Sequence, residues 1–366
     1  MKREILCVVV GLALAGSSWG AEPGLTLTSP SDCQVFQRQS LTQGVVVVEG
    51  TADTATTVGV CIGDCVWQPV PVDPKTKRFR VALPVEAGGW YRVQVRVPGR
   101  EPVMVEHVGV GEVFIVAGQS NSANHGAEKQ KTESGVVSSF DGTRWHLCSD
   151  PQGGASGSGG SFMPAFGDAL LAKQYCPIGI AACGIGATSV RQWLPKGATM
   201  TNQPTTGAFV KMIRPGVWES TGQAFDGLMK RLEYFGTNGV RAILWHQGES
   251  DAGQARAGYP AERQITGAQY RGFMEQLIRA SRERAGWAIP WFVAQATYHS
   301  EKDPADEEFR AAQKALWTSG VALEGPDTDA LRGEFRAGVH FNGKGQKEHG
   351  RLWAEKVGAY LDKVQK

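Results

Sequence analysis

The hydrophobic pattern of the chain changes in character near residue 107. Before that point, short β-branched or aromatic runs, such as 45–49 and 90–96, alternate with turn residues such as Asp73-Pro74. Strands at this spacing, without helical periodicity, are typical of a small β-sandwich. We therefore predict an all-β accessory domain over residues 22–107, which could serve in binding or only space and support another domain.

Beyond residue 107, apolar strands alternate with segments of helical periodicity, which predicts a mostly parallel, doubly wound α/β sheet over residues 108–366. We expect its central strands at 113–116, 178–182, 242–245 and 291–294. We expect helices between them at 164–174, 223–235, 269–285 and 307–319. Apolar side chains at helical spacing predict a closing amphipathic helix: Leu352, Trp353, Val357, Tyr360 and Leu361. The glycine and serine run at 153–161 has no such pattern and is expected to be a flexible loop.

The first 21 residues have the pattern of a cleavable signal peptide. Lys2 and Arg3 precede an apolar stretch at 5–15, and small residues follow at the cleavage site. A lipoprotein signal would need cysteine where Ser17 stands, so we expect release into a secreted or periplasmic location without a membrane anchor. No later stretch approaches the ~20 apolar residues of a membrane span.

Without residues 1–21 the chain has a net charge of +1, which gives no reason to expect binding to nucleic acid or an anionic membrane. Six cysteines remain, and an even number in an exported protein permits disulfides, although six allow fifteen pairings. Cys61 with Cys65, and Cys176 with Cys183, are the pairs we expect first. Metal binding is the weaker interpretation, since the sequence has no Cys-x-x-Cys and no pair of histidines at helical spacing. The oligomeric state cannot be predicted.

Candidate chemistry begins at Ser120, which follows the apolar run 113–116 and the sequence Gly118-Gln119. A serine just past a buried strand, with glycine before it for a tight turn, lies at the carboxyl edge of a sheet, where open α/β folds bind ligands. Ser120 is therefore the candidate nucleophile. The alternative is that it only caps a following helix.

Two further strands break into polar or glycine-rich sequence at their carboxyl ends, at 183–188 and 246–251. Together with Ser120 they provide three strand ends that could converge on one crevice. An acyl-transfer site needs donors for the oxyanion of its transition state. The amides of Ser120 and Gly186 and the side-chain amide of Gln247 could supply them.

A serine nucleophile also needs a base. Of the seven histidines, His340 is our choice, because it lies in a loop directly before the final helix. His246 is expected to support the turn at Gln247. The others are expected to be structural: His107, His125, His146, His299 and His349.

Four blocks of these residues, in order along the chain, resemble the SGNH hydrolase superfamily and specifically its sialate O-acetylesterase branch, which also includes acetylxylan esterases. The resemblance covers roughly residues 108–366. The blocks are Gly118-Gln119-Ser120-Asn121, Gly186-Ala187-Thr188 with Trp193, Trp245-His246-Gln247-Gly248-Glu249, and Gly338-Val339-His340. The lipase motif Gly-x-Ser-x-Gly occurs only inside the predicted signal peptide, at 16–20, so an α/β-hydrolase is disfavoured.

The resemblance implies a three-layer α/β/α, flavodoxin-like fold and a carboxylic ester hydrolase that removes O-acetyl groups from sugars or polysaccharides without a metal or cofactor. Ser120 would attack the acetyl carbonyl and His340 would take its proton. Ser120, Gly186 and Gln247 would form the oxyanion hole. For substrate binding we assign Gln119, Asn121, Arg191 and Trp193. Gln192, Arg144 and Trp145 are further candidates, and all of these could equally be surface or core residues.

This sequence departs from the family pattern at two positions. Many relatives have aspartate where Ala337 stands, three residues before the histidine, so another group must orient His340. Glu249 is the first choice, a backbone carbonyl the second and Glu334 the third, while Glu249 could instead only brace its loop. Ala187 stands where relatives often have glycine, and alanine should be tolerated unless the backbone needs a positive φ.

The substrate is less constrained by the sequence than the reaction. An arginine that points into the crevice would favour a carboxylated sugar such as sialic acid. Without one, a neutral, xylan-like substrate is favoured. A catalytically inactive carbohydrate-binding protein is the alternative from another class, because of Ala337. The retention of Ser120, Gln247 and His340 together argues against it.

Overall fold

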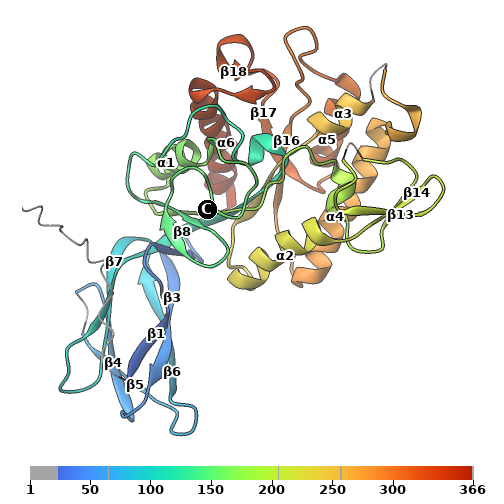
Figure 1. The fold of residues 1–366 in the computed structure, drawn as a ribbon. Coiled ribbons are helices and arrows are strands. Elements are labelled where there is room, and N and C mark those ends of the chain that lie inside the picture. Colours follow the sequence, from blue (N-terminus) through green and yellow to red (C-terminus); the bar gives the residue numbers. More distant parts are fainter. Residues whose placement is uncertain (1–23, 65, 205, 256–257, 365–366) are drawn as a thin grey trace, which may run out of the picture.

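The computed structural model describes residues 24–64, 66–204, 206–255 and 258–364. The predicted signal peptide lies outside these residues. Figure 1 shows two parts, a lobe of β-strands coloured blue to teal and a larger part in which helices surround a sheet. The strand β8 (Val103–Gly118) passes from the first into the second.

The N-terminal lobe contains two β-sheets. One has the order β1-β3-β6, and in the other β7 pairs with both β4 and β8, β5 with β4, and β2 with β8. Valines, leucines and isoleucines of both sheets form one apolar core between them, with Val46, Val60 and Val95 fully buried. The strands are β1 (Leu25–Ser29), β2 (Gln34–Gln37), β3 (Gln43–Ala52), β4 (Thr57–Ile62), β5 (Gln68–Pro71), β6 (Arg78–Glu86) and β7 (Gly88–Arg96).

The expected domain boundary at residues 107 and 108 falls inside β8. The first half of this strand pairs with β7 and β2 in the N-terminal lobe, and its second half pairs with β11 and β15 in the larger part. The two parts therefore share a continuous strand rather than a linker.

The larger part is built on a sheet of order β10-β9-β11-β8-β15-β16-β17, in which every pair except β10 with β9 is parallel. From β8 the chain leads first to one side of the sheet and then to the other, so the direction of winding switches at β8. Further strands are β9 (Val137–Phe140), β10 (Trp145–Leu147), β11 (Ile178–Ala182), β15 (Ala242–His246), β16 (Trp291–Gln295) and β17 (Leu323–Asp327).

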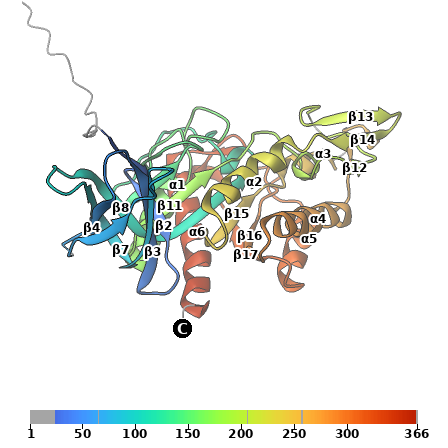
Figure 2. The same cartoon turned by 90° about the horizontal axis from the view of Figure 1, so that it is seen from below.

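Helices cover both faces of this sheet, which gives three layers (Figures 1 and 2). Residues Val113 and Ile115 of β8 pack with α2, α4 and α5, whereas Phe114 and Val116 pack with α1 and α6. The helices are α1 (Met163–Gln174), α2 (Gln223–Phe235), α3 (Glu249–Gln254), α4 (Gly267–Ala285), α5 (Glu307–Thr318) and α6 (Gly343–Val364). No helix among the described residues is long and apolar enough to cross a membrane.

Shorter strands and turns lie within the loops of the larger part. The strands β12, β13 and β14 form a small sheet, and β18 and β19 form a hairpin. Their bounds are β12 (Thr199–Met200), β13 (Val210–Arg214), β14 (Val217–Ser220), β18 (Arg336–Ala337) and β19 (His340–Phe341). The described residues also form four 3-10 turns: η1 (Ser120–Ser122), η2 (Val190–Trp193), η3 (Ala261–Arg263) and η4 (Gly333–Phe335).

The expected central strands and helices are confirmed to within a few residues, but β9, β10 and β17 were not predicted. These strands lie toward the edges of the sheet and have short or interrupted apolar runs, such as Val-Ser-Ser-Phe in β9 and Leu-Glu-Gly-Pro-Asp in β17. Their strand conformation depends on pairing with a neighbouring strand, and the hydrophobic periodicity of the sequence does not reveal that pairing.

The expected disulfide between Cys176 and Cys183 is wrong. Both are buried free thiols, and they lie at opposite ends of the five-residue strand β11. At about 3.3 Å per residue, the strand holds them far beyond the ~7 Å limit between Cα atoms of a disulfide. The pair Cys61 and Cys65 stays a prediction, because Cys65 lies outside the described residues.

Candidate active site

A pocket of about 540 Å³ opens at the carboxyl edge of the sheet, where the winding switches. Its wall comes from the segments that follow β8, β11, β15 and β16, together with the hairpin of β18 and β19. The expected convergence of strand ends is therefore present. The lining residues are Gln119, Ser120, Asn121, His125, Ser156, Ile185, Gly186, Ala187, Glu249, Ser250, Tyr298, His299, Val339 and His340.

Ser120 is the first residue of the 3-10 turn η1, directly beyond β8. Gly118 makes this turn possible, since it has a φ of +126° and a Cβ there would lie 2.1 Å from the carbonyl oxygen of His246. The first amides of a helix have no intrahelical acceptor, so the N–H of Ser120 can donate to a ligand. Ser120 itself is 7% exposed and lines the pocket.

His340 reaches the pocket from the hairpin of β18 and β19, where its cross-strand partner is Ala337. Its ring centroid lies 5.5 Å from that of His125, and both rings line the pocket. Burial, followed by the positive fields of His125 and Arg336, lowers the pKa of His340 below the usual imidazole value. The imidazole is therefore neutral at pH 7, as a general base must be.

Glu249 lies at the start of α3 and also lines the pocket. Its Oε1 accepts a hydrogen bond of 3.0 Å from Nδ2 of Asn121, and its Oε2 is buried without a partner in the described part of the chain. Burial raises the pKa of Glu249 to about 7.

None of the carboxylates in the described residues forms a hydrogen bond or ion pair with the ring of His340. Glu249 is joined to it indirectly, because Asn121 Nδ2 also donates to the carbonyl of Val339 at 3.2 Å. Glu334, the third choice for orienting acid, is exposed and paired with Lys344.

Two of the expected oxyanion donors are engaged elsewhere. The amide of Gly186 donates to Oγ of Ser156 at 2.7 Å. The side chain of Gln247 is fully buried outside the pocket wall, and its Nε2 donates to the carbonyl of Thr188 at 3.1 Å and to Asp251 Oδ2 at 2.8 Å. Of the three expected donors, the Ser120 amide is therefore the one that has no other acceptor among the described residues.

The residues expected to bind substrate divide into two pairs. Gln119 and Asn121 line the pocket, but their side chains tie its loops together, since Gln119 Oε1 accepts the amide of Ser250 at 3.0 Å. Arg191 and Trp193 are fully buried outside the pocket wall. Arg191 Nη2 donates to Gln254 Oε1 at 2.6 Å. This placement corrects the expectation that Arg191 and Trp193 line a sugar site.

Ser156 and Tyr298 line the pocket although the sequence did not indicate them, and His125 and His299, which were expected to be structural, line it as well. His125 lies five residues after Ser120, and its Nε2 is 3.2 Å from Ser156 Oγ. Tyr298 and His299 follow the strand expected at 291–294, so the rule that polar residues gather at strand ends could have found them. Ser156 lies in the glycine and serine loop, where the sequence gives no such signal.

Ala187 has a positive φ of +59°, so alanine is unfavourable at this position, as anticipated from the sequence for that case.

A group with the donor atoms for a metal ion does occur among the described residues, but away from the pocket, at Asp32, Cys33 and His107.

Fold and site together define an α/β protein whose serine and histidine face one pocket at the carboxyl edge of a parallel sheet. Residues 110–359 match the model of the family described as carbohydrate esterase, sialic acid-specific acetylesterase. The chain therefore belongs to this family of esterases, which acts on acetylated sugars.

The fold is similar to that of a carbohydrate acetylesterase from Xanthomonas citri, with a TM-score of 0.56 and 18% identity over 92% of this chain and 74% of that one. An Arabidopsis thaliana protein gives a TM-score of 0.45 and 19% identity over 69% of this chain and 98% of that one. A family two carbohydrate esterase from Clostridium thermocellum, solved with cellohexaose, gives 0.36 and 9% over 88% and 89%. No curated protein matches the chain.

Proposed function

We propose that the protein is an exported carbohydrate O-acetylesterase that works through a serine acetyl-enzyme. The observation that carries the proposal is that Ser120 and His340 line the same pocket at the switch point of the sheet. The lowered pKa of His340 suits a base that must be neutral at pH 7.

In the proposed reaction, Ser120 Oγ attacks the acetyl carbonyl while the imidazole of His340 takes the hydroxyl proton. The amide of Ser120 donates to the oxyanion that forms. The tetrahedral intermediate then breaks its bond to the sugar oxygen, which receives the proton from His340. Water, activated by the same imidazole, releases acetate and restores Ser120.

We propose that Glu249 acts as a positioning residue rather than as the direct partner of His340. Its Oε1 holds Asn121, and Asn121 holds the carbonyl of Val339, the residue before His340. The residue opposite His340 in the hairpin is Ala337, so no acid stands in that position. A catalytic pair of Ser120 and His340, supported indirectly by Glu249, agrees with this.

We further propose that the acetylated sugar is neutral. The described residues that line the pocket include no arginine or lysine, so the site lacks the fork that would pair with a carboxylate. Ile185, Ala187 and Val339 instead give it an apolar wall suited to an acetyl methyl group and a sugar face. An O-acetylated hemicellulose fits this lining better than an O-acetylated sialic acid.

The test measures acetate release from acetylated xylan and from O-acetylated sialic acid by the wild type, Ser120→Ala and Ser122→Ala. We expect Ser120→Ala to lose at least about 10⁴-fold in kcat, as loss of a serine nucleophile does. Ser122 is a matched control, since it is buried in the same turn and its Oγ donates to the carbonyl of Gln119. Ser122→Ala should keep activity within about tenfold.

Labelling by a fluorophosphonate provides a second readout, which Ser120→Ala should abolish and Ser122→Ala should retain. A wild type that is neither labelled nor active would favour the carbohydrate-binding alternative. Preference for O-acetylated sialic acid would contradict the neutral substrate while leaving the serine mechanism intact.

A further inference from the structure

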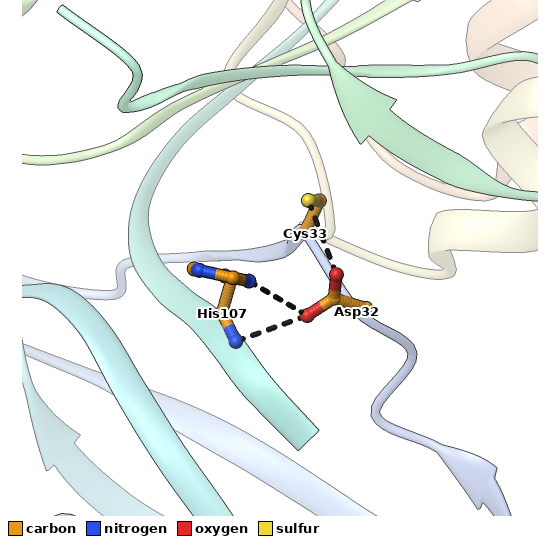
Figure 3. A group of neighbouring side chains, drawn as sticks. All are labelled: Asp32, Cys33 and His107. Atoms are coloured by element: carbon orange, nitrogen blue, oxygen red, sulfur yellow. Dashed lines mark hydrogen bonds and ion pairs between the residues drawn. The ribbon is translucent and has the colours of Figure 1, made fainter. Parts of the chain in front are cut away.

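Three side chains with metal-binding atoms meet where the N-terminal lobe joins the larger part (Figure 3). A carboxylate oxygen of Asp32, the sulfur of Cys33 and a ring nitrogen of His107 all lie within 4.8 Å of one another. Cys33 is 8% exposed, whereas the side chains of Asp32 and His107 are 29% and 48% exposed. An ion could therefore reach the group from solvent.

The strand pairing brings these residues together from distant parts of the chain. Parallel pairing of β2 with β8 sets Gln34 opposite Val108, so the residues just before them, Cys33 and His107, are neighbours. Cys33 has a left-handed backbone with a φ of +61°, which a cysteine adopts only when the surrounding structure requires it.

Asp32 fixes the geometry of the group. Its Oδ1 accepts the main-chain N–H of His107 at 3.1 Å and lies 3.0 Å from Nδ1 of the same residue. Its Oδ2 lies 3.6 Å from the sulfur of Cys33 (Figure 3). These separations are close to those between neighbouring ligands around a tetrahedral ion that has bonds of about 2.0–2.3 Å.

We propose that Asp32, Cys33 and His107 bind one zinc ion, with water as the fourth ligand. Thiolate, imidazole and carboxylate are the ligands that zinc uses in proteins. On binding, the thiol proton of Cys33 passes to solvent and a sulfur–zinc bond forms. The carboxylate and thiolate together balance the charge of the divalent ion.

The site would be structural. His107 and Ser120 are separated by 13 positions, most of them in the extended strand β8, which would span up to roughly 40 Å if straight. His107 does not line the pocket of the nucleophile. The ion would tie the turn between β1 and β2 to β8, the strand that links the two parts. Zinc should therefore change stability and leave the chemistry at Ser120 unchanged.

The experiment uses the tag-free protein without residues 1–21, stripped with a chelator and kept reduced with a phosphine. Zinc binding is measured by calorimetry, and cobalt serves as a spectroscopic substitute because a thiolate ligand gives a sulfur-to-cobalt charge-transfer band. The variants are Cys33→Ala and His107→Gln. His146→Gln is the control, since His146 and Asp141 form a pair of matching exposure and a 2.9 Å contact, and no third ligand completes a group there among the described residues.

We expect one zinc ion per chain, a rise in Tm with added zinc, and a cobalt band that Cys33→Ala abolishes. Cys33→Ala and His107→Gln should each weaken zinc binding at least about tenfold, and His146→Gln should not. Equal affinity in the wild type and both variants, or a cobalt complex without the band, would overturn the proposal. Esterase activity is assayed separately with and without zinc, so its absence would bear on the proposed function alone.

Discussion

The wall of the pocket and the network behind it are built from the same loops but differ in how their polar groups are satisfied. Glu249 and Asp251 lie two residues apart on α3. Glu249 faces the pocket with one donor on Oε1 and none on Oε2 among the described residues. Asp251 faces away and accepts hydrogen bonds from four groups, on Ser189, Val190, Arg191 and Gln247.

This difference distinguishes residues that can take part in the reaction from residues that only hold the loops in place. A buried network centred on one carboxylate holds loops in place, since its members would be left unpaired if that carboxylate were removed. Groups that retain unused hydrogen-bonding capacity beside a cavity can respond to a ligand. By this criterion Glu249 and His340 belong to the site, and Arg191 and Asp251 belong to the buried network that supports it.

The Arg191→Ala variant should have the largest effect, and it tests whether the buried network around Asp251 stabilises the protein without binding substrate. The change leaves Asp251 buried without its cation, and breaking a buried pair in this way typically costs about 3–5 kcal/mol. We expect this loss in the free energy of unfolding measured with urea, with KM nearly unchanged where the variant is folded. A raised KM at unchanged stability would place Arg191 at the substrate after all.

The Glu249→Gln variant tests the raised pKa of Glu249 through the pH dependence of protein stability. The folded pKa of about 7 lies above the ordinary value of 4.5, so ionisation of Glu249 costs the folded state stability as pH rises from 4.5 through 7. Glutamine has no such cost. The stability of Glu249→Gln relative to wild type should therefore increase between pH 4.5 and 8, by up to about 3 kcal/mol.

The activity of the same variant separates two roles for Glu249. If it only positions Asn121, glutamine keeps the acceptor oxygen and kcat should fall by about tenfold or less. A loss of a thousandfold or more would instead identify Glu249 as the acid that orients His340.

His125→Asn tests the influence of one pocket histidine on the other. Removing the positive field of His125 favours the protonated form of His340, so the pKa of His340 should rise. The acid limb of kcat/KM against pH should move to higher pH by about one unit or less. His146 is exposed and does not line the pocket, so His146→Asn is the control, and an unmoved limb would leave burial and the positive field of Arg336 as the causes of the lowered pKa.

Ala187→Gly should have the smallest effect. Glycine adopts the φ of +59° without a Cβ clash, so we expect a gain in stability of up to about 1 kcal/mol with activity unchanged. Ala330→Gly is a suitable control, because Ala330 is exposed and lacks a positive φ, and glycine there should destabilise the protein. A destabilised Ala187→Gly would show that the Cβ of Ala187 makes contacts that outweigh the strain.

The sequence by itself determined the family, the central strands and the helices. Long apolar runs such as 113–116 can only be buried, and helical periodicity identifies amphipathic helices whatever they pack against. It also brought Ser120, Gly186, Glu249 and His340 into consideration, and all four line one pocket. Strand ends and glycines indicated Ser120 and Gly186, because the carboxyl ends of parallel strands meet at one edge. His340 came from its place before the final helix, and Glu249 from the family resemblance.

Only the tertiary structure decided which polar side chains face the cavity. Arg191 and Trp193 belong to the same segment after β11 as Gly186, yet packing buries both, and no periodicity in a loop reports that direction. The hydrogen bond from Gly186 to Ser156, and the neighbourhood of His125 and His340, join residues that are distant in the chain. Such contacts depend on how loops cross in space, which local propensity does not determine.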